Sequence, residues 1–268
     1  MRFDVGPRYS KVAAVGGIYS NYLALEVCLA DARDLGVEAV VCLGDLGAFG
    51  PHPDRVFPLL DAPDVLVIRG NYDDSIARGL DDCQCGYTDP RDNHFARLSY
   101  RYTFTNTAPA NRAWMADLPG EYRFRLGELD VLACHGSPRQ MNEFLWESTT
   151  PTHFLEKLAR DHDADVILGT HTGIQWVRRL SGSRAYVNAG ALGRPANDGR
   201  TEVWYAVLEA HGRDLDVSFR PVEYDYRWLG NEMAAEGLPE EFIETVETGW
   251  WTTCLEILPG KERASGRF

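Results

Sequence analysis

Four side chains that can bind a metal ion follow apolar segments of this chain, each in a glycine-rich loop: Asp45, Asn71, His135 and His171. A carboxylate, a carboxamide and two imidazoles offer the oxygen and nitrogen donors that a divalent transition metal prefers. Each residue also has a simpler explanation, because Asp45 could cap a helix, Asn71 could end a turn, and either histidine could be a hydrogen-bonded core residue. Their common setting favours a single metal site.

The segments before these loops are short and apolar, which predicts buried strands. Strand, loop and helix follow one another three times in the first 75 residues, with strands expected at 12–15, 39–43 and 65–68. Further strands are expected at 128–134, 164–168 and 185–188, and a hairpin at 203–208 and 215–219 with its turn near Gly212. This order predicts sheets with helices on their faces and with the four candidate ligands at strand ends.

Two segments fall outside this alternation, and we expect both to be helical. Residues 81–118 are polar and aromatic without a clear strand, which predicts an inserted cap, and residues 225–268 are predicted to form amphipathic C-terminal helices. We assign the whole chain, 1–268, to one domain.

The six cysteines are scattered, which favours reduced core thiols over a disulfide framework. Only Cys83-Gln84-Cys85 is a close pair, and its spacing differs from the C-x-x-C pairs of zinc sites.

Composition excludes some functions. With 27 basic and 40 acidic residues the formal net charge is -13, so a polyanionic nucleic acid would be repelled, whereas a small anionic substrate held by a metal is compatible. No signal peptide and no membrane span are indicated, so we expect a soluble, cytoplasmic protein without a membrane partner. The sequence leaves open whether the chain forms a homo-oligomer.

The motifs together resemble the calcineurin-like metallophosphoesterase superfamily, specifically a bacterial branch with a compact cap. The resemblance covers nearly the whole chain and rests on Gly44-Asp45 with Gly50-Pro51, Gly70-Asn71-Tyr72-Asp73, Asp82-Cys83-Gln84-Cys85, His135-Gly136-Ser137-Pro138-Arg139, and Val187-Asn188-Ala189-Gly190 with Gly193-Arg194-Pro195. It implies an α+β fold, a four-layer αββα sandwich of two mixed sheets flanked by helices. It also implies phosphoester hydrolysis at two metals bound by loops on one edge.

The chain departs from this family at the positions of the first metal. The opening motif Asp-x-His-Gly-Asn and the second histidine of the late Gly-His-x-His motif are replaced, so that the ligands exclusive to the first metal map onto Gly17, Tyr19 and Gly173. The resemblance maps all ligands of the second metal onto Asp45, Asn71, His135 and His171. An alignment shifted by one would instead leave His171 between the two ligand positions; we prefer the register that keeps it. We therefore expect one divalent transition metal, Mn, Fe, Zn or Ni.

Five further side chains are candidates for contact with a substrate. Tyr19 and Tyr72 stand where the family often has histidines, and Tyr19 could act as a general acid, hydrogen-bond a substrate oxygen or only fill space. His52 could serve as an acid. Arg139 and Arg194 could pair with a substrate anion, although surface salt bridges would explain them equally well.

Three functions are compatible with these residues. The first is a metal-dependent hydrolase of phosphoesterase fold that acts on a small phosphorylated or otherwise anionic substrate with one retained metal. The second keeps fold and metal but performs a changed, non-phosphatase reaction in specialised metabolism. The third is a non-catalytic relative that binds a ligand or partner, although such a protein would not need the complete second-metal set.

Overall fold

The computed structural model describes residues 6–265. Its strands are β1 (Arg8–Tyr9), β2 (Lys11–Val15), β3 (Ala39–Cys42), β4 (Val65–Val67), β5 (Glu121–Leu126), β6 (Leu129–Cys134), β7 (Val166–Gly169), β8 (Gln175–Arg179), β9 (Ala185–Ala189), β10 (Val203–His211) and β11 (Asp214–Val222). Its helices are α1 (Tyr22–Asp34), α2 (Phe57–Leu60), α3 (Asn71–Arg78), α4 (Pro90–Asn106), α5 (Pro109–Ala116), α6 (Thr152–Asp161), α7 (Tyr226–Ala235), α8 (Glu240–Thr248) and α9 (Gly260–Ala264), with a 3₁₀ turn η1 at Pro53–Val56.

The strands form two mixed sheets. One has five strands in the order β11-β10-β2-β3-β4, and the other has six in the order β1-β5-β6-β7-β9-β8. Strands β2, β3 and β4 are parallel, as are β6, β7 and β9. Because parallel neighbours end on the same side of a sheet, the loops that follow them gather at one edge.

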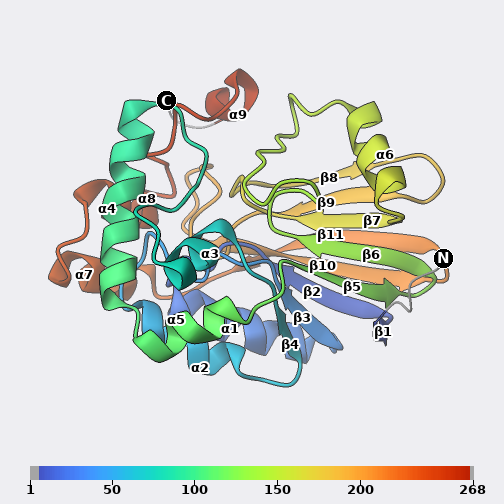
Figure 1. Ribbon diagram of the computed structural model, residues 1–268, viewed down its shortest axis with the longest axis horizontal. Coiled ribbons are helices and arrows are strands. Elements are labelled where there is room, and N and C mark those ends of the chain that lie inside the picture. Colours follow the sequence, from blue (N-terminus) through green and yellow to red (C-terminus); the bar gives the residue numbers. More distant parts are fainter. Residues whose placement is uncertain (1–5, 266–268) are drawn as a thin grey trace.

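The alternation of side chains along the strands explains the layers. In β2, Val12 and Ala14 belong to the core between the two sheets, whereas Ala13 and Val15 pack in the core that contains α1. In β6, Leu132 packs with α6 on the opposite side. Figure 1 shows α1 below and α6 above the paired sheets, which completes a sandwich of helices, sheet, sheet and helix.

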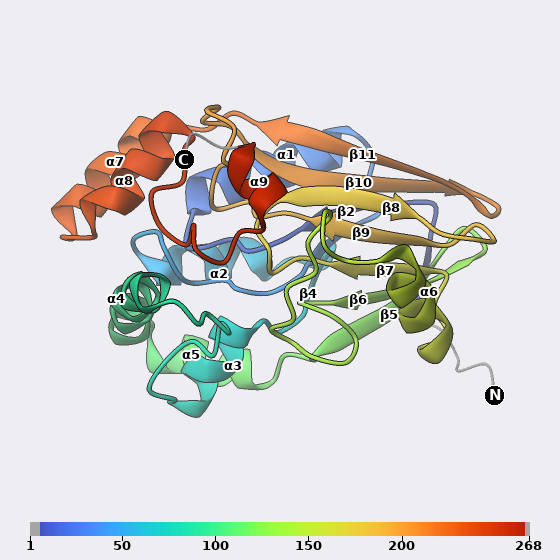
Figure 2. The ribbon, with the colours of Figure 1, turned by 90° about the horizontal axis from the view of Figure 1, so that it is seen from above.

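A helical group lies at one end of this sandwich. Figures 1 and 2 both place α4, α7 and α8 at the end away from the β10–β11 turn. Helix α4 begins at Pro90 because the Asp89 side chain accepts hydrogen bonds from the next free backbone amides. It contacts α8 through Phe95 and Phe242, whose ring centroids are 5.9 Å apart. Segment 81–118 thus contains α4 and α5, and its role as a cap stays a prediction.

The predicted fold class, an α+β sandwich of two sheets and flanking helices, is confirmed. The predicted hairpin is also confirmed, since His211 pairs with Asp214 at its turn. Strands β5 and β8 were not predicted, because charged and polar residues interrupt their apolar pattern.

The expectation that the cysteines are reduced is wrong for one pair. Cys83 and Cys85 form a disulfide, while the other four cysteines are free. The local turn brings the two Cα atoms to 5.3 Å, within the usual range for a disulfide, which residue spacing alone did not reveal.

Among the described residues, no helix combines the length and the apolar character that crossing a bilayer requires.

Candidate metal centre

The loops after strands of both sheets bring three candidate ligands together. Asp45 follows β3, His135 follows β6 and His171 follows β7, and one ligand atom from each lies within 4.8 Å of the others. Nε2 of His135 lies 3.3 Å from Oδ2 of Asp45 and 3.2 Å from Nδ1 of His171. All three side chains are buried. The preferred register of the late motif therefore puts His171 beside the other two residues.

The imidazole of His135 is oriented by the backbone. Its Nδ1 lies 2.6 Å from the carbonyl oxygen of Leu43, to which it donates a hydrogen bond. With the proton on Nδ1, the lone pair of Nε2 faces Asp45 and His171. A metal-binding histidine usually has this arrangement.

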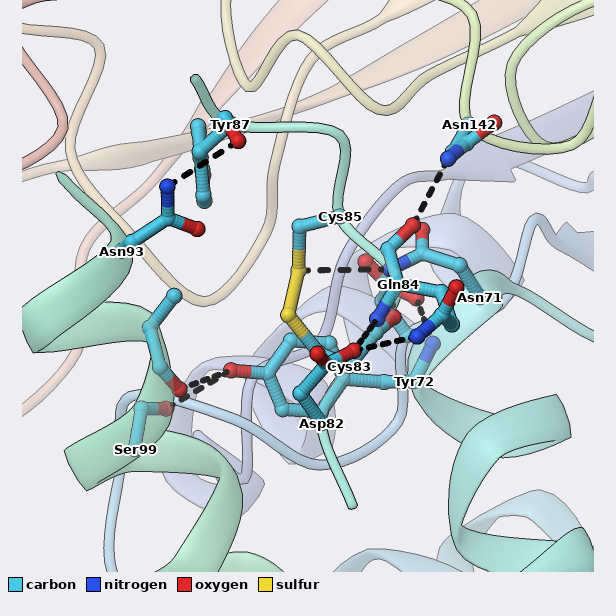
Figure 3. The surroundings of a disulfide bond; sticks show 12 residues. Asn71, Tyr72, Asp82, Cys83, Gln84, Cys85, Tyr87, Asn93, Ser99 and Asn142 are labelled. Carbon is cyan, nitrogen blue, oxygen red and sulfur yellow. Dashed lines mark hydrogen bonds between the residues drawn. A yellow bond between two sulfur atoms is a disulfide. The ribbon is translucent and has the colours of Figure 1, made fainter. Parts of the chain in front are cut away.

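Asn71 begins α3 and is separated from the end of β4 by three residues. Its Nδ2 donates to the carbonyl oxygen of Cys83 at 2.8 Å and to Sγ of Cys85 at 3.4 Å, as Figure 3 shows. The disulfide loop thereby fixes the carboxamide, and Asn71 Oδ1 remains buried with no hydrogen-bond partner among the described residues.

In His171, Nδ1 is the nitrogen that faces Nε2 of His135. A buried polar atom left unpaired costs about 1–3 kcal/mol, so Asn71 Oδ1 calls for a ligand. Asp45, His135 and His171 together are called the triad below. Asn71 lies next to the triad, because the following backbone amide, that of Tyr72, donates a hydrogen bond to Asp45 Oδ1 at 3.1 Å. The donor atoms present therefore fit a divalent ion.

Asp73 holds the loop that carries Asp45. Its carboxylate accepts hydrogen bonds from the backbone amides of Asp45 at 2.8 Å, Leu46 at 3.0 Å and Gly70 at 2.8 Å. Asp45 itself has a φ of 57°, a conformation that needs such support. We did not single out Asp73 from the sequence, although its place three residues after Gly70 at a helix start is the signal of a capping box.

Gly70 lets the two ligand loops approach each other. A Cβ at this position would lie 2.4 Å from Asp45 Oδ1 and 2.9 Å from His135 Nδ1. Any larger residue would displace these side chains, so glycine is required by the close approach.

The loop that carries His171 is held by Asn188, at the end of β9. Its Nδ2 donates to the carbonyl oxygen of Thr170 at 2.9 Å and to Oγ1 of Thr172 at 3.0 Å. These bonds stabilise the positive φ of 69° at His171.

Mutual electrostatics set the charges of the triad. Burial alone would raise the pKa of Asp45, but His135 and His171 outweigh burial and lower it. Burial opposes the charged form of His135, yet Asp45 raises the pKa of His135 above its usual value. Burial and the neighbouring His135 lower the pKa of His171 to about 3. An ionised Asp45 and a neutral His171 are the forms that bind a metal.

A cavity of about 60 Å³ lies beside the triad and includes Asp45, His171 and Arg194 in its lining. Aromatic side chains form most of its wall: Tyr19, Phe49, Tyr72, Tyr87, Phe95 and Phe242. Burial and the nearby Asp45 raise the pKa of Tyr19, so its hydroxyl remains a hydrogen-bond donor at neutral pH.

The structure places the other candidates differently. Tyr72 lines the cavity, but its hydroxyl lies 3.1 Å from Ser99 Oγ (Figure 3). His52 lies 3.9 Å from Glu232 on α7 and is not in the cavity lining. Arg139 is exposed and pairs with Glu143, also outside the lining.

The chain is similar to proteins of one family. The profile of the calcineurin-like phosphoesterase superfamily domain matches residues 11–213. An uncharacterized protein of Methanocaldococcus jannaschii is 22% identical over 254 residues, which cover 90% of this chain and 98% of that protein.

Two solved structures are similar over their whole length. A hypothetical protein from Pyrococcus horikoshii has a TM-score of 0.75 at 23% identity, covering 91% of this chain and 100% of that one. A metallophosphoesterase from Sphaerobacter thermophilus has a TM-score of 0.67 at 25% identity, covering 90% and 99%.

Proposed function

Because this chain belongs to the calcineurin-like phosphoesterase superfamily, we propose that it is a hydrolase that uses one divalent metal ion to cleave a phosphoester of a small anionic molecule. The observation that carries this proposal is the buried cluster of Asp45, His135 and His171, one ligand atom of each lying within 4.8 Å of the others. Oδ1 of Asn71 is buried without a partner among the described residues, and the Tyr72 amide on the same loop donates to Asp45. A bound metal ion would give these donor atoms a common partner.

In this proposal Asp45, Asn71, His135 and His171 hold the ion. When bound, a divalent ion there supplies Lewis acidity toward a phosphoryl oxygen and makes water at the site more acidic. The chain's own groups position the reaction. Asp73 holds the Asp45 loop, the Tyr19 hydroxyl offers a hydrogen bond to a substrate or leaving-group oxygen, and the aromatic wall limits access of bulk water.

The positions that the family resemblance assigns to another metal support a single-ion site. Gly17 and Gly173 offer no ligand atoms, and the proton on Tyr19 is held firmly because burial raises its pKa. No second ion is available to hold the attacking oxygen. Each 1.36 kcal/mol of transition-state stabilisation lost in this way and not replaced slows hydrolysis about tenfold. We therefore expect weak activity on generic aryl phosphodiesters.

The proposal gives no role to three of the residues singled out from the sequence. His52 and Arg139 are absent from the lining of this cavity and contact glutamates, and Arg139 lines a separate cavity that also includes His135. Tyr72 lines the cavity beside the triad, but its hydroxyl is engaged by Ser99 and by the carbonyl oxygen of Ala96.

The test is phosphate release from a panel of small phosphate esters by protein stripped of metal and then reloaded with Mn²⁺, Fe²⁺, Zn²⁺ or Ni²⁺. We expect release to require the metal and to be lost in Asp45→Ala but kept in Asp61→Ala, a matched exposed aspartate after α2. Metal-independent release, or equal release by Asp45→Ala, would overturn the proposal. Metal-dependent turnover without phosphate release would favour the changed reaction, and a ligand bound but never altered would favour the binding protein.

A further inference from the structure

The space beside Gly17 and Gly173 is filled by aromatic rings. A Cβ on Gly17 would lie 2.4 Å from Cε1 of Tyr19 and 2.9 Å from its Oη. A Cβ on Gly173 would lie 3.2 Å from Cη2 of Trp251. Both glycines therefore face side chains that lie in the volume a larger residue would need.

Arg194 stacks on Trp251 and lies close to a further ring, that of Phe49. Its guanidinium carbon is 3.8 Å from the ring centroid of Trp251 and 5.2 Å from that of Phe49. The Arg194 loop contacts the Gly17 loop directly, since the amide of Gly193 donates to the carbonyl oxygen of Gly17 at 2.9 Å. Tyr19 and Arg194 thus line the same cavity as the candidate ligands Asp45 and His171.

The charge of Arg194 is not neutralised within the described residues. The side chain is only 7% exposed, its Nη2 donates to the carbonyl oxygen of Thr253 at 2.7 Å, and its Nε is buried without a partner. No carboxylate of the described chain forms an ion pair with it, in contrast to the exposed Arg200, which pairs with Asp198. A buried guanidinium without an anion is costly, because burial removes its hydration and only neutral groups replace it.

We infer that Arg194 is an anion subsite, held in place by Trp251 and Thr253 and assisted by the Tyr19 hydroxyl. Its guanidinium supplies the positive charge that a second metal ion would otherwise provide. The inference rests on the proposed function, and it names the part of the substrate that binds here. The guanidinium fork matches the oxygens of a phosphoryl group.

The test is binding of inorganic phosphate to metal-loaded protein, measured by calorimetry. In Arg194→Met we expect the dissociation constant to rise about 10- to 100-fold, because a hydrogen-bonded charge is lost, while metal content stays unchanged. Arg200→Met is the matched control, since Arg200 also stacks on a tryptophan, Trp204 at 4.9 Å, but does not line the cavity. Its phosphate affinity should equal that of the wild type.

Two milder variants keep the test decisive if Arg194→Met fails to fold. Arg194→Lys keeps the charge but loses the fork, and Tyr19→Phe removes only a hydroxyl, so each should weaken phosphate binding by a smaller factor of about 3- to 10-fold. Unchanged affinity in the folded Arg194 variants, or no phosphate binding by the wild type, would overturn the subsite. If the wild type binds phosphate through Arg194 but hydrolyses no ester, the proposed function fails and the subsite stands. If hydrolysis proceeds with an unchanged KM in Arg194→Met, the subsite alone fails.

Discussion

The substitution Gly17→Ala tests whether the aromatic rings have closed part of the site. The new Cβ would lie 2.4 Å from Cε1, 2.5 Å from Cζ and 2.9 Å from Oη of Tyr19. Carbon atoms pack at about 3.5–4.0 Å, so the ring would have to move by roughly 1 Å. Gly17 lies outside the left-handed region of the backbone, so the clash, not backbone strain, is what the substitution adds.

We expect Gly17→Ala to lower the free energy of unfolding by about 1–3 kcal/mol, the usual cost of overpacking a filled space. Urea unfolding followed by tryptophan fluorescence measures this value, and each kcal/mol corresponds to about 2–4 °C in Tm for a chain of this size. Gly120→Ala is the control, because a Cβ there meets no atom within 4 Å. It should leave stability unchanged or slightly higher.

A double-mutant cycle identifies the cause. In a Tyr19→Ala background the added methyl group meets no ring, so Gly17→Ala should cost close to nothing, and the coupling between the two positions should be about 1–3 kcal/mol. A wild-type stability for Gly17→Ala, or the same loss in both backgrounds, would refute the view that Tyr19 fills this volume.

Three further outcomes follow from the contacts around the ligands. Asp73→Ala should lose about 3 kcal/mol or more of stability by urea unfolding, since three buried backbone amides lose their acceptor; an unchanged midpoint would contradict this. Replacing Cys83 and Cys85 by serine should weaken metal binding about tenfold in a competition titration, because the disulfide loop orients the carboxamide ligand; equal affinity would show that the loop is dispensable. Divalent metal at 100 times its dissociation constant should stabilise the wild type and His162→Ala by about 2.7 kcal/mol but not His171→Ala, and a gain in all three would place the metal elsewhere.

Much of the fold could be predicted from the sequence because local pattern determines it. The apolar runs before Asp45 and His135 are buried strands, and their side chains alternate between two cores as a period of two requires. Strand β8 was missed because its polar residues lie at the edge of a sheet, where an apolar pattern is not required.

The candidate metal ligands could also be predicted from local pattern, whereas the side chains that pack around them could not. His135 and His171 follow the parallel neighbours β6 and β7, which bring them to one edge of their sheet, and Asp45 follows β3 of the sheet packed against it. The contact of Gly173 with Trp251 joins residues that are distant in the sequence, and no local pattern specifies it. The sequence could not distinguish Arg139 from Arg194 as an anion-binding residue, because only tertiary packing buries Arg194 and leaves Arg139 exposed.

Metal stoichiometry tests the central claim most directly. Protein purified without added metal, or reloaded after stripping, should contain one divalent transition metal per chain by elemental analysis. Anomalous scattering from a crystal should place that ion between Asp45, Asn71, His135 and His171. Two tightly bound ions per chain, or a single ion bound elsewhere, would contradict the single-ion site.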